Sequence, residues 1–147
     1  MITKTRPTLA RKTISGYALL GRIRRLILEE PRRYNQRSTL AVVMEGHPYP
    51  PDIIPPCGTI GCVGGWIVAL TRPSQISSHT DVVALTQEIL QLDIYSTHVL
   101  TDFHAAGWRG FTMEEIVPHA ERGAEHIAQF MKDHKAHLQA VQIVVER

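Results

Sequence analysis

Cysteine is scarce in this sequence and long apolar runs are missing, which excludes several classes of protein. Only two of the 147 residues are cysteine, too few for a disulfide-stapled scaffold, so reduced thiols are expected. The longest apolar run, from Ile60 to Leu70, is interrupted by glycine and is too short to cross a bilayer. Basic and polar residues follow Met1, where a secretory signal would be apolar. We therefore expect a cytoplasmic protein without a membrane partner, folded as one domain.

The sequence motifs of common enzymes and nucleotide-binding folds are missing too. The chain has no G-x-S-x-G, no H-E-x-x-H, no G-x-G-x-x-G and no Walker loop with its lysine. Zinc-finger spacing and a DNA-recognition helix are also not found. The one suggestive polar cluster is Asp102 and His104 beside Trp108, and ordinary loop structure explains it as well. The sequence therefore favours a non-enzymatic protein, and we expect no catalytic residues.

Charge is distributed unevenly along the chain. The net charge is +2, but residues 1–37 carry +8 and the remainder carries −6. Such asymmetry favours an acidic partner, either a nucleic acid or a phosphorylated ligand. The alternative is a solvated basic face that balances an acidic face within the fold or across an oligomer contact.

The stretch from Pro55 to Leu70 contains no charged residue and concentrates glycine and cysteine. We expect a helix capped by Thr59, with Gly58 before it, that runs to about Leu70. Because this helix is apolar on every side, it should be buried on every side. Its three glycines cost roughly 2–3 kcal/mol relative to alanine, which favours close approach of another backbone. They are Gly61, Gly64 and Gly65.

Helical spacing of apolar residues elsewhere predicts an all-α fold, a compact bundle of five to six helices around that buried glycine-rich helix. Local signals give the other expected helices. They run from Gly16, after a Ser15 cap, to Glu30 before Pro31; from Asp81; from Asp93 to Leu100; and from Thr112, with an interruption at Pro118, to about Lys135.

The remaining segments are assigned by composition. Residues 1–12 form a basic N-terminal arm, and residues 13–147 form a single helical domain. Residues 45–56 hold five of the nine prolines and are expected to form an extended loop. Residues 34–44 are either a strand or a helical turn. Residues 138–147 either extend the last helix or form a short strand, because Val141, Ile143 and Val145 alternate.

Two segments together carry a family resemblance. Pro31-Arg32-Arg33-Tyr34-Asn35 precedes the specific core Cys57-Gly58-Thr59-Ile60-Gly61-Cys62-Val63-Gly64-Gly65-Trp66, and the loop Gly107-Trp108 follows. The chain thereby resembles a family of small uncharacterised proteins of bacteria and their phages, over roughly residues 20–131. Arg109 stands where that family has proline, and its members lack the proline-rich insert. The resemblance implies a helical fold and a phage or mobile-element setting, and it implies no activity.

The two cysteines admit three interpretations. In the first turn of a helix, the dipole would lower the pKa of the Cys62 thiol. The three interpretations of the pair are two small buried side chains, a redox pair, or half of a metal site. Cys57-x4-Cys62 with His98-x5-His104 would supply the four ligands of tetrahedral zinc. Zinc is thus a candidate cofactor, although none is assigned.

Four histidines fall in the last helix at spacings that place them near one face. They are His119, His126, His134 and His137. A solvated or subunit-contacting face is the simplest interpretation, and we expect a homo-oligomer.

The expected anion site combines a helix start with the basic first helix. The backbone N–H groups at Gly58 and Thr59 would point at an anion, and arginines would hold phosphate oxygens in bidentate contacts. The arginines are Arg22, Arg25, Arg32 and Arg33, and the loop residues Trp108 and Arg109 complete the site.

The function expected from the sequence is that of a small binding protein, phage or mobile-element encoded. It would hold an anionic, nucleotide-like ligand or a host protein, and so counter host defence. One alternative is a nucleic-acid-associated accessory protein that uses the basic residues 1–37. Another is a small zinc-binding structural protein.

Overall fold

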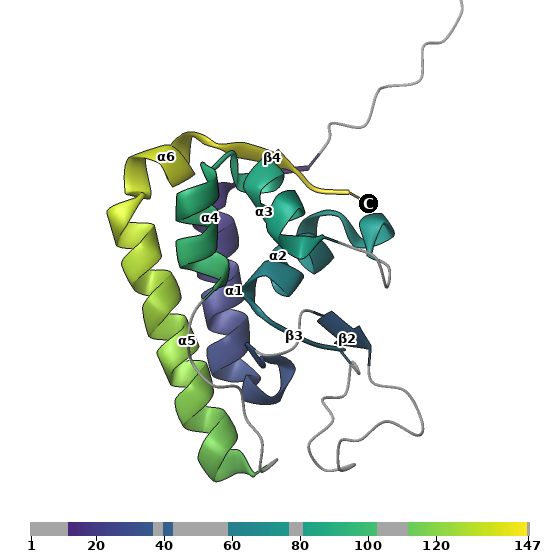
Figure 1. Ribbon diagram of the computed structural model, residues 1–147, viewed down its shortest axis with the longest axis vertical. Helices are drawn as coiled ribbons and strands as arrows, with labels where there is room; N and C mark the ends of the chain where they lie inside the picture. Colours follow the sequence, from purple (N-terminus) through teal and green to yellow (C-terminus); the bar gives the residue numbers. More distant parts are fainter. Residues whose placement is uncertain (1–11, 37–39, 43–58, 77–80, 103–111, 147) are drawn as a thin grey trace, which may run out of the picture.

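The computed structural model describes residues 12–36, 40–42, 59–76, 81–102 and 112–146, and these are mostly helical. Within them lie six α-helices, which are α1 (Gly16–Glu29), α2 (Val63–Thr71), α3 (Val82–Leu90), α4 (Ile94–Thr101), α5 (Met113–Asp133) and α6 (Lys135–Ala140). The two longest, α1 and α5, lie side by side, and the short helices α2, α3 and α4 pack beside them (Figure 1). No helix in these ranges is long and apolar enough to span a membrane.

Short strands modify the all-α expectation. β1 (Thr13–Ser15) pairs antiparallel with β4 (Gln142–Val144), and β2 (Leu40–Val42) pairs antiparallel with β3 (Thr59–Gly61). The tail is therefore helix first, in α6, and strand afterwards. Each ladder joins segments distant in sequence, which helical spacing does not report. Two single-turn 3₁₀ helices, η1 (Pro31–Arg33) and η2 (Pro73–Gln75), complete the described elements.

Local capping signals were read correctly at three helix starts. The side chains of Ser15, Asp81 and Asp93 each accept a hydrogen bond from the backbone N–H three residues later, at 3.0, 3.0 and 2.7 Å. At the other end of α1, Glu30 is the cap before Pro31, and Arg33 Nη1 lies 2.7 Å from Glu30 Oε2. That contact offsets an acidic group placed against the helix dipole.

The helix start predicted at Thr59 is wrong. Thr59 opens β3, and α2 begins at Val63 with Cys62 as its cap. The backbone of β3 is used in the ladder with β2, so these residues cannot start a helix. Gly61 consequently lies in the strand instead of the helix.

The interruption predicted at Pro118 is also wrong, because α5 runs through this residue. Proline removes one N–H, which would have bonded to the carbonyl of Glu114 in the first turn. Burial of the apolar face of α5, including Ile116, Ile127 and Phe130, outweighs that loss. The helix instead ends at Asp133, and Lys135 begins α6.

Gly64 packs closely against two neighbouring helices. A Cβ built at this position would lie 2.7 Å from Val82 Cγ1 of α3 and 3.4 Å from Thr101 Cγ2 of α4. The close neighbours are therefore side chains, where the sequence suggested another backbone. Most of α2 is buried, including Trp66 and Ile67.

Gly64→Ala should lower the free energy of unfolding by about 1–3 kcal/mol, because its methyl group overlaps Val82. Gly21→Ala in α1 is the matched control. Its nearest contact would be Met131 Cε at an ordinary 3.6 Å, so helix propensity should stabilise this variant by about 0.5–1 kcal/mol. Urea unfolding followed by circular dichroism measures both changes. Equal changes in the two variants would contradict the packing described at Gly64.

Candidate functional site

The two segments that carry the family resemblance pack against each other. Trp66 Nε1 donates a hydrogen bond of 2.8 Å to the carbonyl of Arg33, whose guanidinium lies 4.5 Å from the centroid of the Trp66 ring. Asn35 N donates to the carbonyl of Gly61 at 3.1 Å. The contact joins η1 to α2 and β3, which gives both segments a structural role.

Gln36 links four parts of the chain. Its Oε1 accepts hydrogen bonds from the Tyr34 hydroxyl (2.9 Å) and Val63 N (3.3 Å), and its Nε2 donates to the carbonyl of Thr101 (2.6 Å). Its backbone N donates to His119 Nε2 at 3.1 Å. Sequence reasoning missed this hub, because its partners lie far apart in the chain and share no spacing.

His119 is buried on α5 and stacked on Tyr34, with ring centroids 4.9 Å apart. Since Nε2 accepts from Gln36, the proton of the neutral ring is on Nδ1, which has no hydrogen-bond partner in the described residues. Burial, together with the charge of Arg122, lowers the pKa of His119 to about 4. The ring is therefore neutral near pH 7.

The four histidines do not share one exposed face. His119 points inward, His126 donates to the carbonyl of Val99 (2.7 Å), and His137 donates to that of Leu90 (2.9 Å). His134 stacks on Phe130, with centroids 4.2 Å apart. This grouping was wrong because His119 lies on the buried face of α5, and because α5 ends at Asp133, so the helical spacing does not extend to His137.

Cys62 differs from its expected chemistry. Its Sγ caps α2 by accepting from Gly65 N at 3.3 Å, and only 8% of the residue is exposed. Burial raises the pKa of the thiol, and this effect exceeds the lowering by backbone N–H groups. The lowered pKa predicted from the helix dipole is therefore wrong, and Cys62 fits the interpretation as a small buried side chain.

The zinc set stays a prediction, because Cys57 and His104 lie outside the described residues. Of its other two members, Cys62 is buried at the start of α2, and His98 is exposed on α4 beside the Asp102 carboxylate. No three potential metal ligands cluster within the part of the chain that the structure describes.

The predicted anion site is divided by the structure. Gly58, Trp108 and Arg109 lie outside the described residues. The first-turn N–H groups of α2 that an anion would need are already used, since Val63 N bonds to Gln36 and Gly65 N bonds to Cys62. The four arginines of the predicted site do lie within the described residues.

Arg22 and Arg25 are exposed on α1 and line a depression of about 290 Å³. Its other lining residues are Leu26, Glu29 and Glu30. Arg33 is held by Glu30 and Trp66, and Arg32 precedes it in the same 3₁₀ turn. Arg22 and Arg25 form no hydrogen bond or ion pair within the described residues.

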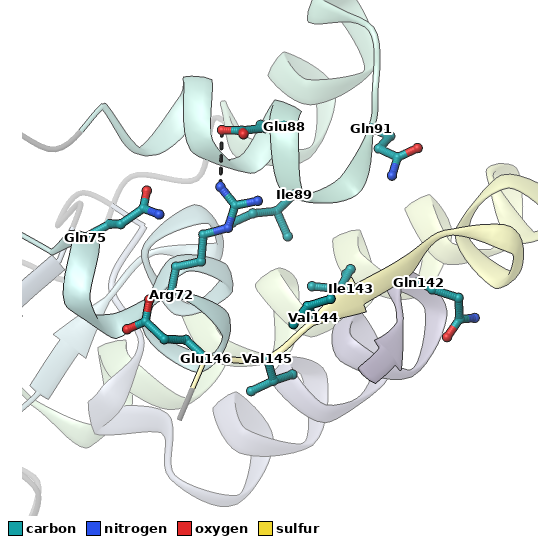
Figure 2. A pocket seen from close by; sticks show the side chains of 10 residues that line it. All are labelled: Arg72, Gln75, Glu88, Ile89, Gln91, Gln142, Ile143, Val144, Val145 and Glu146. Atoms are coloured by element: carbon teal, nitrogen blue, oxygen red, sulfur yellow. Dashed lines mark ion pairs between the residues drawn. The ribbon is translucent and has the colours of Figure 1, made fainter. Parts of the chain in front are cut away.

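A larger groove of about 550 Å³ lies between α3 and β4 (Figure 2). Arg72, just after α2, reaches across to Glu88 of α3, with 3.2 Å between Nη1 and Oε2. At one end Glu146 accepts from both the backbone N (2.7 Å) and the hydroxyl (2.5 Å) of Ser74. Sequence reasoning did not find this groove, since it is formed by separate segments.

The chain matches no protein-family model, no curated protein sequence and no solved structure. The family resemblance and the setting that it implies therefore stay predictions.

His119 should make stability depend on pH. Its folded pKa of about 4 lies below the ordinary 6.5, so between these values the unfolded chain binds the proton and the folded chain does not. Stability is therefore full above about pH 6.5 and falls as the pH drops towards 4, by on the order of 2–3 kcal/mol. Denaturant unfolding at several pH values measures the slope.

His119→Gln supplies the control, because glutamine can accept from Gln36 N but does not titrate. Its stability should change less than that of the native chain between pH 6.5 and 4, whatever its absolute value. Parallel curves for the two proteins would refute the assignment of this slope to His119.

Proposed function

We propose that this chain is a small non-enzymatic binding protein that holds an anionic, nucleotide-like ligand against the C-terminal half of α1. The observation that supports the proposal is the pair of uncommitted guanidinium groups on Arg22 and Arg25. Both are exposed, they lie three residues apart on one helix, and they line the same depression. Guanidinium groups bind phosphate oxygens through two parallel hydrogen bonds.

The charge around the depression also favours an anion. Arg33 holds Glu30, so Glu29 remains as the one carboxylate without an ion pair opposite Arg22 and Arg25. The carbonyl end of α1 opposes a negative ligand, and the two guanidinium groups must therefore supply the attraction. A volume of about 290 Å³ suits a phosphate or a sugar phosphate, with the rest of the ligand lying on the surface.

The architecture expected from the sequence belongs to the same proposal. The bundle is organised around α2 as its buried, glycine-rich centre, and this centre holds α1 rigid beneath the ligand. In the phage or mobile-element setting that the resemblance implies, such a protein would sequester a host nucleotide signal or block a host protein. Either action would counter host defence without catalysis.

The double variant Arg22→Ala with Arg25→Ala should lose at least about tenfold in affinity for a nucleotide, since each lost bidentate contact removes about 1.5–3 kcal/mol. Isothermal titration calorimetry with ATP, a cyclic dinucleotide and pyrophosphate as probes measures the loss. Lys12→Ala with Lys132→Ala is the control, because it removes the same charge elsewhere and should leave affinity within about twofold.

Two outcomes would contradict the proposal. One is that none of the three probes binds the native protein, and the other is that both double variants lose affinity equally. A gel-shift assay with duplex DNA at about 50 mM salt tests the nucleic-acid alternative, whose affinity should fall steeply as salt rises. Duplex binding that survives loss of Arg22 and Arg25 would favour that alternative.

A further inference from the structure

The pairing of β1 with β4 leaves one edge of β4 open. In this ladder Thr13 pairs with Val144, Ile14 with Ile143 and Ser15 with Gln142. Just beyond the ends of the pair, Gly16 N donates to the carbonyl of Val141 and Val145 N donates to that of Lys12. Hydrogen-bonded pairs alternate along an antiparallel ladder, so Ile143 bonds to β1 through both main-chain groups.

Gln142 and Val144 must then point their N–H and C=O groups away from β1. Glu146 lies two residues further along, on the same side as Gln142 and Val144. Its backbone N donates a hydrogen bond of 2.8 Å to the carbonyl of Thr71 at the end of α2, which confirms that this side faces away from β1. The structure records no main-chain partner for Gln142 or Val144 among the residues that it describes. These four polar groups face the groove between β4 and α3.

The edge carries no lysine, proline or bulge within β4, and its protection lies in its three-residue length and in the nearby α3. Proteins cover such edges or place lysine, proline or a bulge on them. Here the strand reads Gln142, Ile143, Val144, and Val144 is 47% exposed. The edge is held extended at both ends, by Gly16 on one side and by Thr71 and Ser74 on the other.

We propose that this open edge of β4 is a docking site for an extended peptide segment of a partner protein, which adds to β4 as a strand inside the groove. The proposal is independent of Arg22 and Arg25. Main-chain groups on alternate residues match an added strand, because a strand also presents its N–H and C=O groups to one side at every second residue. A volume of about 550 Å³ lies within the range of ligand sites.

Charge defines the peptide further. Arg72 faces two carboxylates in the groove, Glu88 and Glu146, and the Glu88 side chain is 66% exposed. The groove is therefore acidic by one charge, which favours a segment with a lysine or arginine beside Glu88. The groove lies beside α3. A single extended segment therefore enters it more readily than a strand that belongs to a second copy of this domain.

Amide hydrogen exchange tests the edge itself. The N–H groups of Gln142 and Val144 should exchange at least about tenfold faster than those of Ile143 and Val145, which are bonded to β1. Equal protection of all four would overturn the proposal, because the edge would then already be occupied.

Selection from a random heptapeptide display library against the intact protein provides the probe, and the selected peptides are then synthesised and measured by fluorescence anisotropy. They should carry a basic residue, and Gln142→Pro should weaken binding at least about tenfold by removing one N–H from the groove. Gln142→Ala keeps that N–H and should stay within about twofold. Peptides that bind Gln142→Pro as well as the native chain would overturn the proposal.

N-methylation of the peptide provides a test that does not depend on folding of the proline variant. Methylation at alternate amides should abolish binding in one register and leave it unchanged in the other, as strand addition requires. Uniform tolerance of methylation, or no enriched peptide, would overturn the proposal. Sedimentation showing that the native chain dimerises and Gln142→Pro does not would also overturn it, since a second copy would then occupy the edge.

Discussion

The requirement that buried polar groups be hydrogen-bonded explains how this molecule holds together around Gln36. One residue satisfies the first N–H of α2, the last carbonyl of α4, the Tyr34 hydroxyl and the acceptor nitrogen of His119. Each of these groups would cost about 1–3 kcal/mol if left buried and unpaired. The helices can therefore pack in this arrangement only when the chain after η1 lies where Gln36 reaches all of them. Trp66 and Arg33 fix that position from the other side.

The two proposed binding surfaces lie outside this interior network. The arginines of α1 and the edge of β4 are formed by different elements and have opposite local charge. The first suits phosphate groups, and the second suits an extended basic segment. The two ligands proposed for these surfaces, a small anion and a protein segment, would therefore not displace one another. Both surfaces are supported by elements whose buried sides belong to the same core.

Burial decides the protonation states of Cys62 and His119. At Cys62 the N–H groups of the helix start lower the pKa of the thiol, but desolvation raises it by more. At His119 desolvation and Arg122 both disfavour the charged ring, and the opposing carboxylate of Glu115 is the weaker influence. A helix dipole contributes only about 0.3–1 kcal/mol at an exposed terminus, whereas burying a charge costs several times more. Both side chains are therefore neutral at pH 7 and contribute to packing.

The sequence by itself determined the features that depend on residues a few positions apart. The caps at Ser15, Asp81 and Asp93, the end of α1 before Pro31, and the exposure of Arg22 and Arg25 all follow from local chemistry and the helical repeat. Tertiary structure alone decided that Thr59 forms a strand, that α5 continues through Pro118, and that His119 turns inward. It also decided the groove at β4, whose walls come from residues 72–91 and 142–146. The physical reason is that a local signal is worth about 1 kcal/mol, and burial or a ladder with a distant strand outweighs it without leaving any periodic trace in the sequence.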